Sequence, residues 1–454
     1  MYSGSVAAMR WGLLSLGLCA GAAEIQEDWT AFKAAFGKSY GATEEAERFR
    51  LFNRSWSAVR QHSSDAFALS LYEWSDWTEA EFLQRKTGFR PSNTSVFTDG
   101  TYTPAAEVLD VSKKRSSSLD WRCNGTNPLG ISAVTPVKDQ GSCGNCWAYS
   151  GGGAAEGGAA TSSALTLDLS VQQIHDCNAP GYGCNGGTIE AALSYFIDEG
   201  LELTADYPTT NSDASSCAAD ESRTAAKGLV ALGTQFDESG LMDMLYQYGP
   251  ATASLDAGCD AFMHYKGGVL TEECSSSCVT HNHAVLIVGY GYDYGAQLPY
   301  WIAKNSWGIG WGESGYVRIA QTGNRGGTAG ILCTNYAIGR AQTFVQEPSY
   351  SEEAMNNMYL YCNETLGYVG DDEDDAWALT TDTAAGIALI SLFVVLAVLI
   401  AGLGLYRWRR SAGRQAQEGR YSRYRERREA RRGLQQSLDP AEEQRRAAVE
   451  VSGA

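Results

Sequence analysis

Apolar side chains recur at helical spacing in two stretches near the start of the chain. In residues 29–36 and 44–61 the large apolar residues return every three or four positions, which predicts two amphipathic helices. From about residue 119 to 346 the sequence becomes rich in glycine and aromatic residues, which indicates a globular domain. We therefore expect a helical N-terminal segment followed by a larger packed domain.

Polar segments separate these regions and continue beyond them. Residues 93–118 are rich in Thr, Ser, Pro and charge, with a Lys-Lys-Arg triplet near their middle. We interpret them as an exposed linker open to proteolysis, so that a cut there would release the globular domain. Residues 347–383 are acidic and are interpreted as a stalk.

Both ends of the chain carry targeting signals. Residues 1–23 combine one basic residue, Arg10, with an apolar run and small residues, the layout of a cleaved secretory signal. Residues 384–406 contain no charge, and as a helix they would extend about 34 Å, enough to cross a bilayer. Arg407 opens a basic tail, 407–454, which the positive-inside rule places in the cytosol. This predicts a single-pass type I membrane protein, with a lysosomal, vacuolar or other endomembrane location as the first expectation.

The net charge is unevenly distributed. The whole chain has a formal charge of -18, but the segment from Arg407 onward holds 13 Arg and 7 acidic residues, so it is +6 and the rest is -24. So acidic a main body argues against nucleic acid, because duplex binding needs a basic surface that releases counterions. No nucleic-acid partner is expected.

Sequons and cysteines agree with a lumenal domain. N-x-[ST] triplets precede the predicted span and none follows it. The acceptor asparagines are Asn53, Asn93, Asn124 and Asn363. The chain has 12 Cys, and in an oxidising compartment a disulfide framework is the default, while metal sites are the less common outcome. Neither a metal nor another cofactor is expected.

The candidate nucleophile lies in TPVKDQGSCGNCWAYS, residues 135–150. Gly-rich turns bring Cys143 and Cys146 to the expected start of a helix, whose unpaired N–H groups and positive dipole end would lower the pKa of a thiol. A cysteine nucleophile needs a base, and His283 stands before an apolar run in HNHAVLIVGYGY that predicts a strand. Asn305, in YWIAKNSWGIGWG, could hold that imidazole in one tautomer and plane.

Two alternatives compete for these residues. Cys143 and Cys146 have the C-x-x-C spacing of a redox or zinc pair, but no partner pair at zinc spacing follows. His281 lies two residues before His283, on the same face of a strand that runs through both, and only one of them can meet Cys146. The remaining histidines are assigned ordinary surface or packing roles; they are His62, His175 and His264.

The three segments resemble the active-site blocks of papain and the cathepsin L group. The resemblance extends over about residues 28–345, roughly 70% of the chain. It implies an α+β fold of the papain-like kind, in which a helical lobe and a β-barrel-like lobe enclose a cleft. By motif position it implies the following site: nucleophile Cys146, base and acid His283, orienting Asn305, oxyanion-hole Gln140 and shielding Trp307.

The family pattern also chooses between the two histidines. In it, the catalytic His directly precedes a small-apolar run, which here is residues 284–286. His283 is therefore preferred as the base, and His281 is expected to face solvent in the preceding loop.

The resemblance implies a set of disulfides and a specificity pocket. The bridges would join Cys143 to Cys184, Cys177 to Cys217, and either Cys274 or Cys278 to Cys333, which leaves Cys123, Cys259 and Cys362 without an assigned partner. The pocket for the second residue before the cut would include Thr188, Ile189, Ser254, Ala284 and Ile338, and Trp307 is counted with the substrate-binding residues. Because Ile338 is apolar and no acid is present, bulky apolar substrate residues are expected and Arg is not.

The N-terminal segment resembles the inhibitory propeptide of the same family. Glu44, Arg48 and Phe52 keep the spacing of its central helix. One departure lies in the mature domain, where Gly151 to Gly153 interrupt the expected helix behind Cys146. Each glycine costs up to about 1 kcal/mol relative to Ala in a helix, unless close packing compensates.

These observations predict a monomeric zymogen cysteine endopeptidase that acts on protein or peptide substrates and is inhibited by its own propeptide. The expected parts are a signal peptide (1–23), propeptide and linker (24–116), peptidase domain (117–346), stalk (347–383), transmembrane helix (384–406) and cytosolic tail (407–454). Two alternatives remain: a catalytically silent, membrane-tethered binding homologue, and an exopeptidase in which residues 123–132 cap one end of the cleft.

Overall fold

The computed structural model describes residues 24–91, 102–104, 115–123, 125–178, 183–213, 216–271 and 274–350. The predicted signal, membrane span and tail lie outside these ranges, as do the sequons at Asn93, Asn124 and Asn363. Within the described ranges, no helix combines the length and apolar character that a bilayer crossing requires. Asn53 is described, and its side chain is exposed on a helix of the N-terminal segment.

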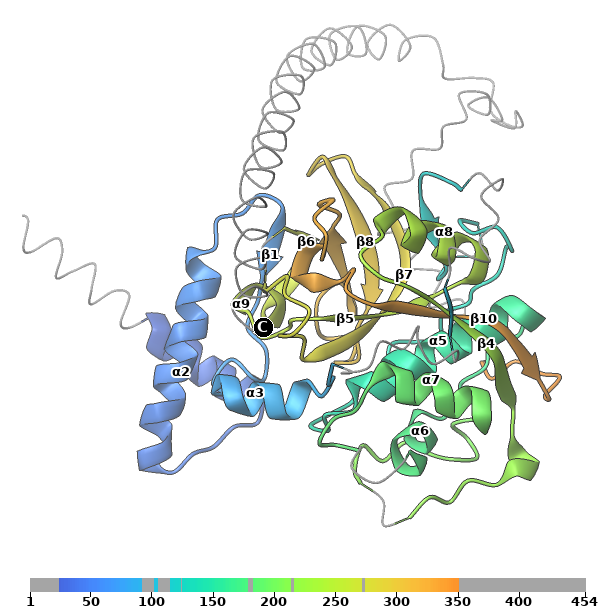
Figure 1. The fold of residues 1–454 in the computed structure, drawn as a ribbon. Helices are drawn as coiled ribbons and strands as arrows, with labels where there is room; N and C mark the ends of the chain where they lie inside the picture. The colour runs from blue at the N-terminus through green and yellow to red at the C-terminus, as the bar shows by residue number, and fades with distance from the viewer. Residues whose placement is uncertain are drawn as a thin grey trace, which may run out of the picture. The chain divides into compact units, whose positions relative to one another are not determined.

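Both helices predicted for the N-terminal segment are confirmed (Figure 1). The elements of this segment are a helix over 24–35, α2 (Ala42–Gln61), β1 (Phe67–Leu69) and α3 (Glu79–Lys86). The first two helices enclose a small core of their own, in which the ring centroids of Trp29 and Phe52 lie 5.1 Å apart. A capping box begins α3, because Thr78 Oγ1 accepts from the Glu81 N–H and Glu81 accepts from the Thr78 N–H.

The domain that follows contains the predicted helical and β-rich lobes. Its helices are α5 (Cys146–Ser163), α6 (Val171–Cys177), α7 (Ile189–Asp198), α8 (Glu238–Tyr248), α9 (Asp260–Met263) and two short 3-10 turns, η2 (Glu221–Arg223) and η3 (Thr328–Gly330). Its strands are β3 (Leu119–Asp120), β4 (Ala226–Thr234), β5 (Ala251–Leu255), β6 (Tyr265–Leu270), β7 (His283–Asp293), β8 (Leu298–Lys304), β9 (Tyr316–Ala320) and β10 (Asn335–Thr343).

A ten-stranded sheet joins both parts of the chain. Its strand order is β1-β6-β9-β8-β7-β5-β10-β4-β2, with β3 paired to β7 and with β2 (Tyr102–Pro104) at one end. The edge strand β1 belongs to the N-terminal segment and pairs antiparallel with β6 of the domain, so Phe67 lies opposite Gly268. The N-terminal segment is therefore held by the main chain of the domain as well as by side chains.

Close packing explains the glycines of α5, the feature that seemed unfavourable in the sequence. The helix is buried from Cys146 to Ala160, and a Cβ at Gly151 would lie 2.4 Å from Ala192 Cβ of α7. A Cβ at Gly158 would lie 2.4 Å from Ile338 of β10. The missing side chains thus let α5 approach its neighbours, and the packing offsets the helix propensity that they forgo.

A partly buried ionic network ties α5 to the β-rich lobe. Lys138 Nζ lies 2.6 Å from Glu156 Oε1 and 2.7 Å from Asp168 Oδ1. The other Glu156 oxygen accepts from Thr135 Oγ1, which in turn accepts from Lys304 Nζ at the end of β8. Each of these buried charges has a partner, as burial requires.

The disulfides include the pairs that the family resemblance implied. Cys143 pairs with Cys184 and Cys177 with Cys217. Cys278, and not Cys274, bonds to Cys333, while Cys274 bonds to Cys259. Cys123 is disulfide-bonded as well, so Cys146 is the free cysteine of the described residues.

We predict that Gly158→Ala destabilises the protein. The added methyl would enter the space of Ile338, and overpacking a tight core typically costs about 1–3 kcal/mol. Thermal unfolding of the purified protein measures the change. Gly125→Ala is the matched control, because its Cβ would meet no atom within 4 Å; equal melting temperatures for the two variants would contradict the packing argument.

Candidate active site

Cys146 begins α5 and is completely buried. Backbone groups close to its sulfur, those of Ala284 and Phe89 among them, favour the thiolate. Burial has the larger effect, and it raises the pKa of the Cys146 thiol to about 12. The sequence led us to expect a lowered thiol pKa. That expectation is wrong for this state of the protein, because the N-terminal segment excludes water from the sulfur.

His283 is the first residue of β7 and is also fully buried. Its Nε2 lies 2.8 Å from Asn305 Oδ1. Since Asn305 Oδ1 can only accept, Nε2 carries the proton and Nδ1 keeps its lone pair. Nδ1 is buried and makes no hydrogen bond among the described residues. Burial lowers the pKa of His283 to about 4, against the opposing effect of Asn305.

Trp307 covers this imidazole and joins it to an aromatic cluster. The ring centroids of His283 and Trp307 lie 4.7 Å apart. Trp307 also packs edge-on against Phe262 of α9 and against Trp311. Trp307 therefore packs over the buried imidazole, and the shielding role that the family resemblance implies for it stays a prediction.

Gln140 lies beside the nucleophile loop and is fixed at both ends of its amide. Its Nε2 donates to Cys143 O at 2.7 Å, and its Oε1 accepts from Ser306 Oγ at 2.6 Å. One Nε2 hydrogen remains to donate to a developing oxyanion. The sequence did not identify Ser306, although it directly follows Asn305; its role depends on a contact across 166 residues.

A short piece of the N-terminal segment crosses the cleft above Cys146. The Gly187 N–H donates to Gly88 O at 2.9 Å, and the Arg90 N–H donates to Gly187 O at 2.8 Å. On the other side, the N–H groups of Gly88 and Phe89 both donate to Asn282 O at 2.9 Å. Gly88 is required there, because a Cβ at this position would lie 1.9 Å from Gly144 O.

Aromatic side chains anchor the same segment next to the histidine. Trp74 and Phe82 pack edge-on against Trp307, with ring centroids 5.4 Å and 5.5 Å away. The Trp74 indole N–H donates to Met263 O at 3.1 Å. The Trp307 indole N–H donates to Lys86 O at 2.8 Å. The two parts of the chain thus share one aromatic core.

The three residues that keep the propeptide spacing have separate structural roles. Arg48 forms a two-pronged ion pair with Glu81 of α3, with both N···O distances at 2.7 Å, and it also contacts Glu44 at 3.2 Å. Phe52 is buried in the small core described above. Arg48 therefore links α2 to α3, the helix that leads into the segment above Cys146.

Four of the five predicted pocket residues lie near the cleft. Thr188 caps α7 and Ile189 begins it, directly after Gly187. Ser254 and Ala284 face each other across β5 and β7, next to His283. All four adjoin the backbone that holds residues 87–90.

Ile338 does not belong to this pocket, so its assignment was wrong. Its side chain packs against Gly158, which lies twelve residues after Cys146 on α5, or about 18 Å along the helix axis. Its strand β10 pairs with β4 and β5 and carries this side chain into the core behind the site.

The prediction that His281 faces solvent was also wrong. The side chain is buried, and its Nδ1 lies 2.8 Å from Ser254 Oγ. It packs against Gly330, where a Cβ would lie 2.0 Å from Nε2. His283, not His281, bonds to Asn305.

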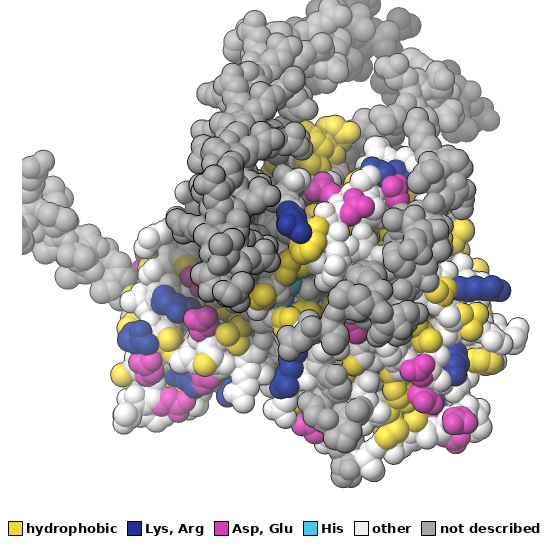
Figure 2. Space-filling model, viewed as in Figure 1, with side chains coloured by type: hydrophobic (Ala, Val, Ile, Leu, Met, Phe, Trp, Pro, Cys, Tyr) yellow, Lys and Arg dark blue, Asp and Glu magenta, His cyan; other side chains and the backbone are white. Residues whose placement is uncertain are grey.

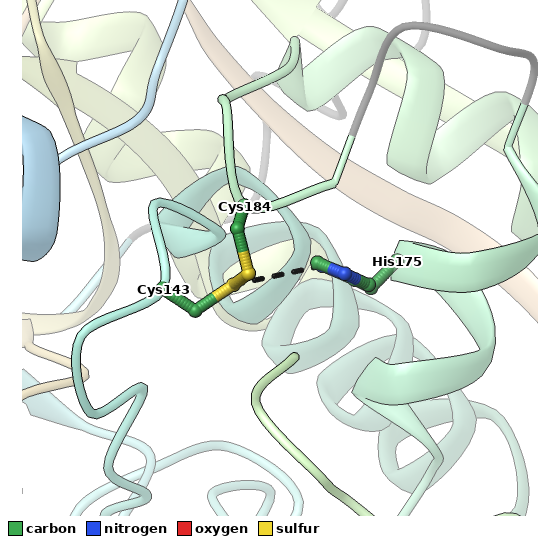
Figure 3. Close-up of side chains that lie close together, drawn as sticks. All are labelled: Cys143, His175 and Cys184. Carbon is green, nitrogen blue, oxygen red and sulfur yellow. Dashed lines mark hydrogen bonds between the residues drawn. A yellow bond between two sulfur atoms is a disulfide. The ribbon is translucent and has the colours of Figure 1, made fainter. Parts of the chain in front are cut away.

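The described residues include one group with the composition of a metal site. Cys143 Sγ, Cys184 Sγ and a His175 ring nitrogen lie within 4.8 Å of one another (Figure 3). The two sulfurs are joined in a disulfide, and only a thiolate is an effective metal ligand. These residues therefore do not fit a metal in this oxidation state.

Comparison with known proteins agrees with this geometry. Residues 115–337 match the description "Papain family cysteine protease", and residues 29–82 match "Cathepsin propeptide inhibitor domain (I29)". The chain is 35% identical to digestive cysteine proteinase 1 of Homarus americanus over 67% of its own length and 91% of that protein. It is 34% identical to human cathepsin L2, over 65% and 87% of the two chains.

A solved procathepsin structure is similar to this chain over nearly all of its own length. The structure of digestive procathepsin L2 proteinase from the Tenebrio molitor larval midgut matches with a TM-score of 0.61 and 31% identity. The match extends over 69% of this chain and 99% of that one.

A buried thiol at the start of α5 and a buried imidazole at the start of β7, both covered by the chain's own N-terminal segment, are the features of a cysteine peptidase proenzyme. This chain belongs to the papain family of cysteine proteases and carries the family's inhibitory propeptide. Its papain-like α+β fold follows from the same relatives.

We predict that Trp74→Ala loosens the propeptide. Removing a buried Trp side chain costs about 3 kcal/mol or more. This shifts the equilibrium between bound and released propeptide roughly 100-fold toward release. The measurement is the rate at which purified proenzyme gains activity at neutral pH. Phe36→Ala, an exposed aromatic of the same segment, is the control. A Trp74→Ala proenzyme as silent as the control would show that the aromatic core does not hold the propeptide.

We predict that Ser306→Ala lowers kcat of the processed enzyme by about tenfold and leaves KM nearly unchanged. Without the hydrogen bond from Ser306 Oγ, the Gln140 side-chain amide can rotate away from the position in which it stabilises the transition state. Removing an oxyanion donor completely lowers kcat more, by roughly 100-fold or more. Steady-state kinetics of Ser306→Ala beside Gln140→Ala measures both effects. A rise in KM alone would place Ser306 in substrate binding instead.

Proposed function

We propose that this protein is a membrane-anchored zymogen endopeptidase that hydrolyses peptide bonds through Cys146, His283 and Asn305. One observation carries the proposal: the chain's own residues 87–90 lie over Cys146, bonded on one side to Gly187 and on the other to Asn282. A cleft that binds an extended peptide by its backbone at these two points suits a peptidase.

The proposed mechanism begins when the propeptide leaves and water enters the cleft. Burial then no longer opposes the charged forms, so the start of α5 and an imidazolium on His283 favour the Cys146 thiolate. The thiolate attacks the peptide carbonyl, and the leaving amine takes its proton from His283. The same histidine then activates a water molecule that releases the acyl group.

Gln140 and the main chain would stabilise the charge that develops on the substrate carbonyl oxygen. The free Nε2 hydrogen of Gln140 and the Cys146 N–H are the proposed donors. Support for this role is the double tether of the Gln140 amide, which fixes its orientation before any substrate binds. Asn305 would keep His283 in the tautomer with its Nδ1 lone pair free.

The proposed preference is for a bulky apolar residue at the second position before the cut. Ile338 does not contribute to this preference, because its side chain packs against Gly158. Support comes from Phe89, which is buried and pairs with Gly187 next to Thr188 and Ile189. A buried aromatic residue of the propeptide thus pairs with the backbone beside the predicted pocket, and none of the four remaining pocket residues is acidic.

Endopeptidase action is favoured over exopeptidase action by the position of residues 123–132. The segment begins and ends beside Trp121. The backbone N–H of Trp121 donates to Val288 O, and its backbone O accepts from the Ala133 N–H. Val288 is five residues from His283 on β7, or about 17 Å along the strand. Both ends of the segment are thus anchored away from the cleft.

The proposed membrane anchor rests on the sequence. The uncharged residues 384–406, with arginines directly after them, support a type I orientation with the peptidase domain in a lumen or outside the cell. The disulfides of the domain suit an oxidising compartment. A lysosomal, vacuolar or other endomembrane location is proposed on the same grounds.

Hydrolysis of internally quenched peptides by processed wild type and Cys146→Ala tests the enzymatic proposal. Activity in the wild type that is absent from the variant is expected, with Leu or Phe preferred over Arg at the second position before the cut. Folded, processed wild type that cleaves none of the peptides would favour the silent binding homologue, and a preference for Arg would overturn the proposed specificity.

A further inference from the structure

His175 and Asp213 form a pair beside the nucleophile loop that the mechanism above does not use. His175 lies on α6 and its side chain is 1% exposed, whereas the Asp213 side chain is 55% exposed. His175 Nε2 lies 3.1 Å from Asp213 Oδ1 and 3.8 Å from Asp176 Oδ1. Asp213 can only accept, so Nε2 carries a proton and donates it to this carboxylate.

The same carboxylate oxygen also holds the backbone of the loop that binds the propeptide. The Cys184 N–H donates to Asp213 Oδ1 at 2.8 Å. Gly183, with φ +104°, makes the approach possible, because a Cβ there would lie 2.3 Å from Oδ1. Asp213 thus joins a buried histidine to the start of residues 183–187.

This loop connects the nucleophile loop to Gly187, one of the two points at which a peptide backbone would bind. Cys184 O accepts from the Gly144 N–H at 3.0 Å, and Cys184 is bonded through its sulfur to Cys143. Three residues later, Gly187 exchanges hydrogen bonds with Gly88 and Arg90. His175 approaches the disulfide as well, with its Nδ1 4.0 Å from Cys143 Sγ (Figure 3).

We propose that His175 and Asp213 are positioning residues. They hold residues 183–187 in the position in which Gly187 can hydrogen-bond the backbone of a bound peptide. His175 fixes the carboxylate from the buried side, and the carboxylate fixes the Cys184 N–H. The proposal rests on the proposed function in one respect, since it takes a substrate to use the Gly187 groups that the propeptide uses here.

The test compares Asp213→Ala, His175→Leu and His175→Gln in the processed enzyme. A hydrogen bond of this kind contributes about 0.5–1.5 kcal/mol, so the first two variants should raise KM about three- to tenfold and change kcat less than twofold. Gln can place an amide N–H near the position of Nε2, so His175→Gln should stay close to wild type. Asp206→Ala, which alters another exposed acid, should have no effect.

Two further readouts separate positioning from general disruption and from failure of the proposed function. Alkylation of Cys146 by iodoacetamide should be unchanged, because this small reagent does not need Gly187. Hydrogen exchange of residues 183–187 in the intact proenzyme should be faster in Asp213→Ala, even if no peptide is hydrolysed by any form of the protein. Unchanged exchange and KM in both disruptive variants, or a parallel loss of alkylation, would overturn the proposal.

Discussion

The backbone hydrogen bond between Gly88 and Gly187 holds the propeptide over Cys146 and His283, and the burial and charge of both residues depend on it. It places the propeptide across the cleft, and the aromatic core around Trp307 and the edge strand β1 hold it there from the side. With the cleft closed in this way, Cys146 and His283 are both completely buried. Burial raises the pKa of the Cys146 thiol and lowers the pKa of His283, so both residues are held in their neutral forms.

Desolvation and the site's own electrostatics act in opposite directions. The start of α5 and the neighbouring N–H groups favour a thiolate, but burial has the greater effect in the proenzyme and leaves a neutral thiol beside a neutral imidazole. The hydrogen bonds from His283 to Asn305 and from Ser306 to Gln140 are already formed in the proenzyme. Activation in this account consists of removing a cover, and it requires no rebuilding of the site.

Local motifs predicted the residues whose neighbours in the sequence are also their neighbours in space. Cys146 at a helix start and His283 at a strand start are of this kind, and so are the helices of the propeptide. Ile338 failed because strand pairing, which no short motif records, carries it to Gly158. His281 and Ser306 were misjudged or missed because their partners, Ser254 and Gln140, are distant in the sequence. The glycines of α5 are unfavourable for an isolated helix, but Ala192 and Ile338, which lie on other elements, fill the space beside them.

In the proenzyme the propeptide covers Cys146, and this burial keeps the thiol protonated. The most direct test is the rate of Cys146 alkylation by iodoacetamide from about pH 5 to pH 8, before and after the linker is cut, since only the thiolate reacts. We expect the intact proenzyme to react slowly at every pH and the processed enzyme to react at least about 100-fold faster, already at acidic pH. Equal rates and equal pH profiles for the two forms would contradict the account.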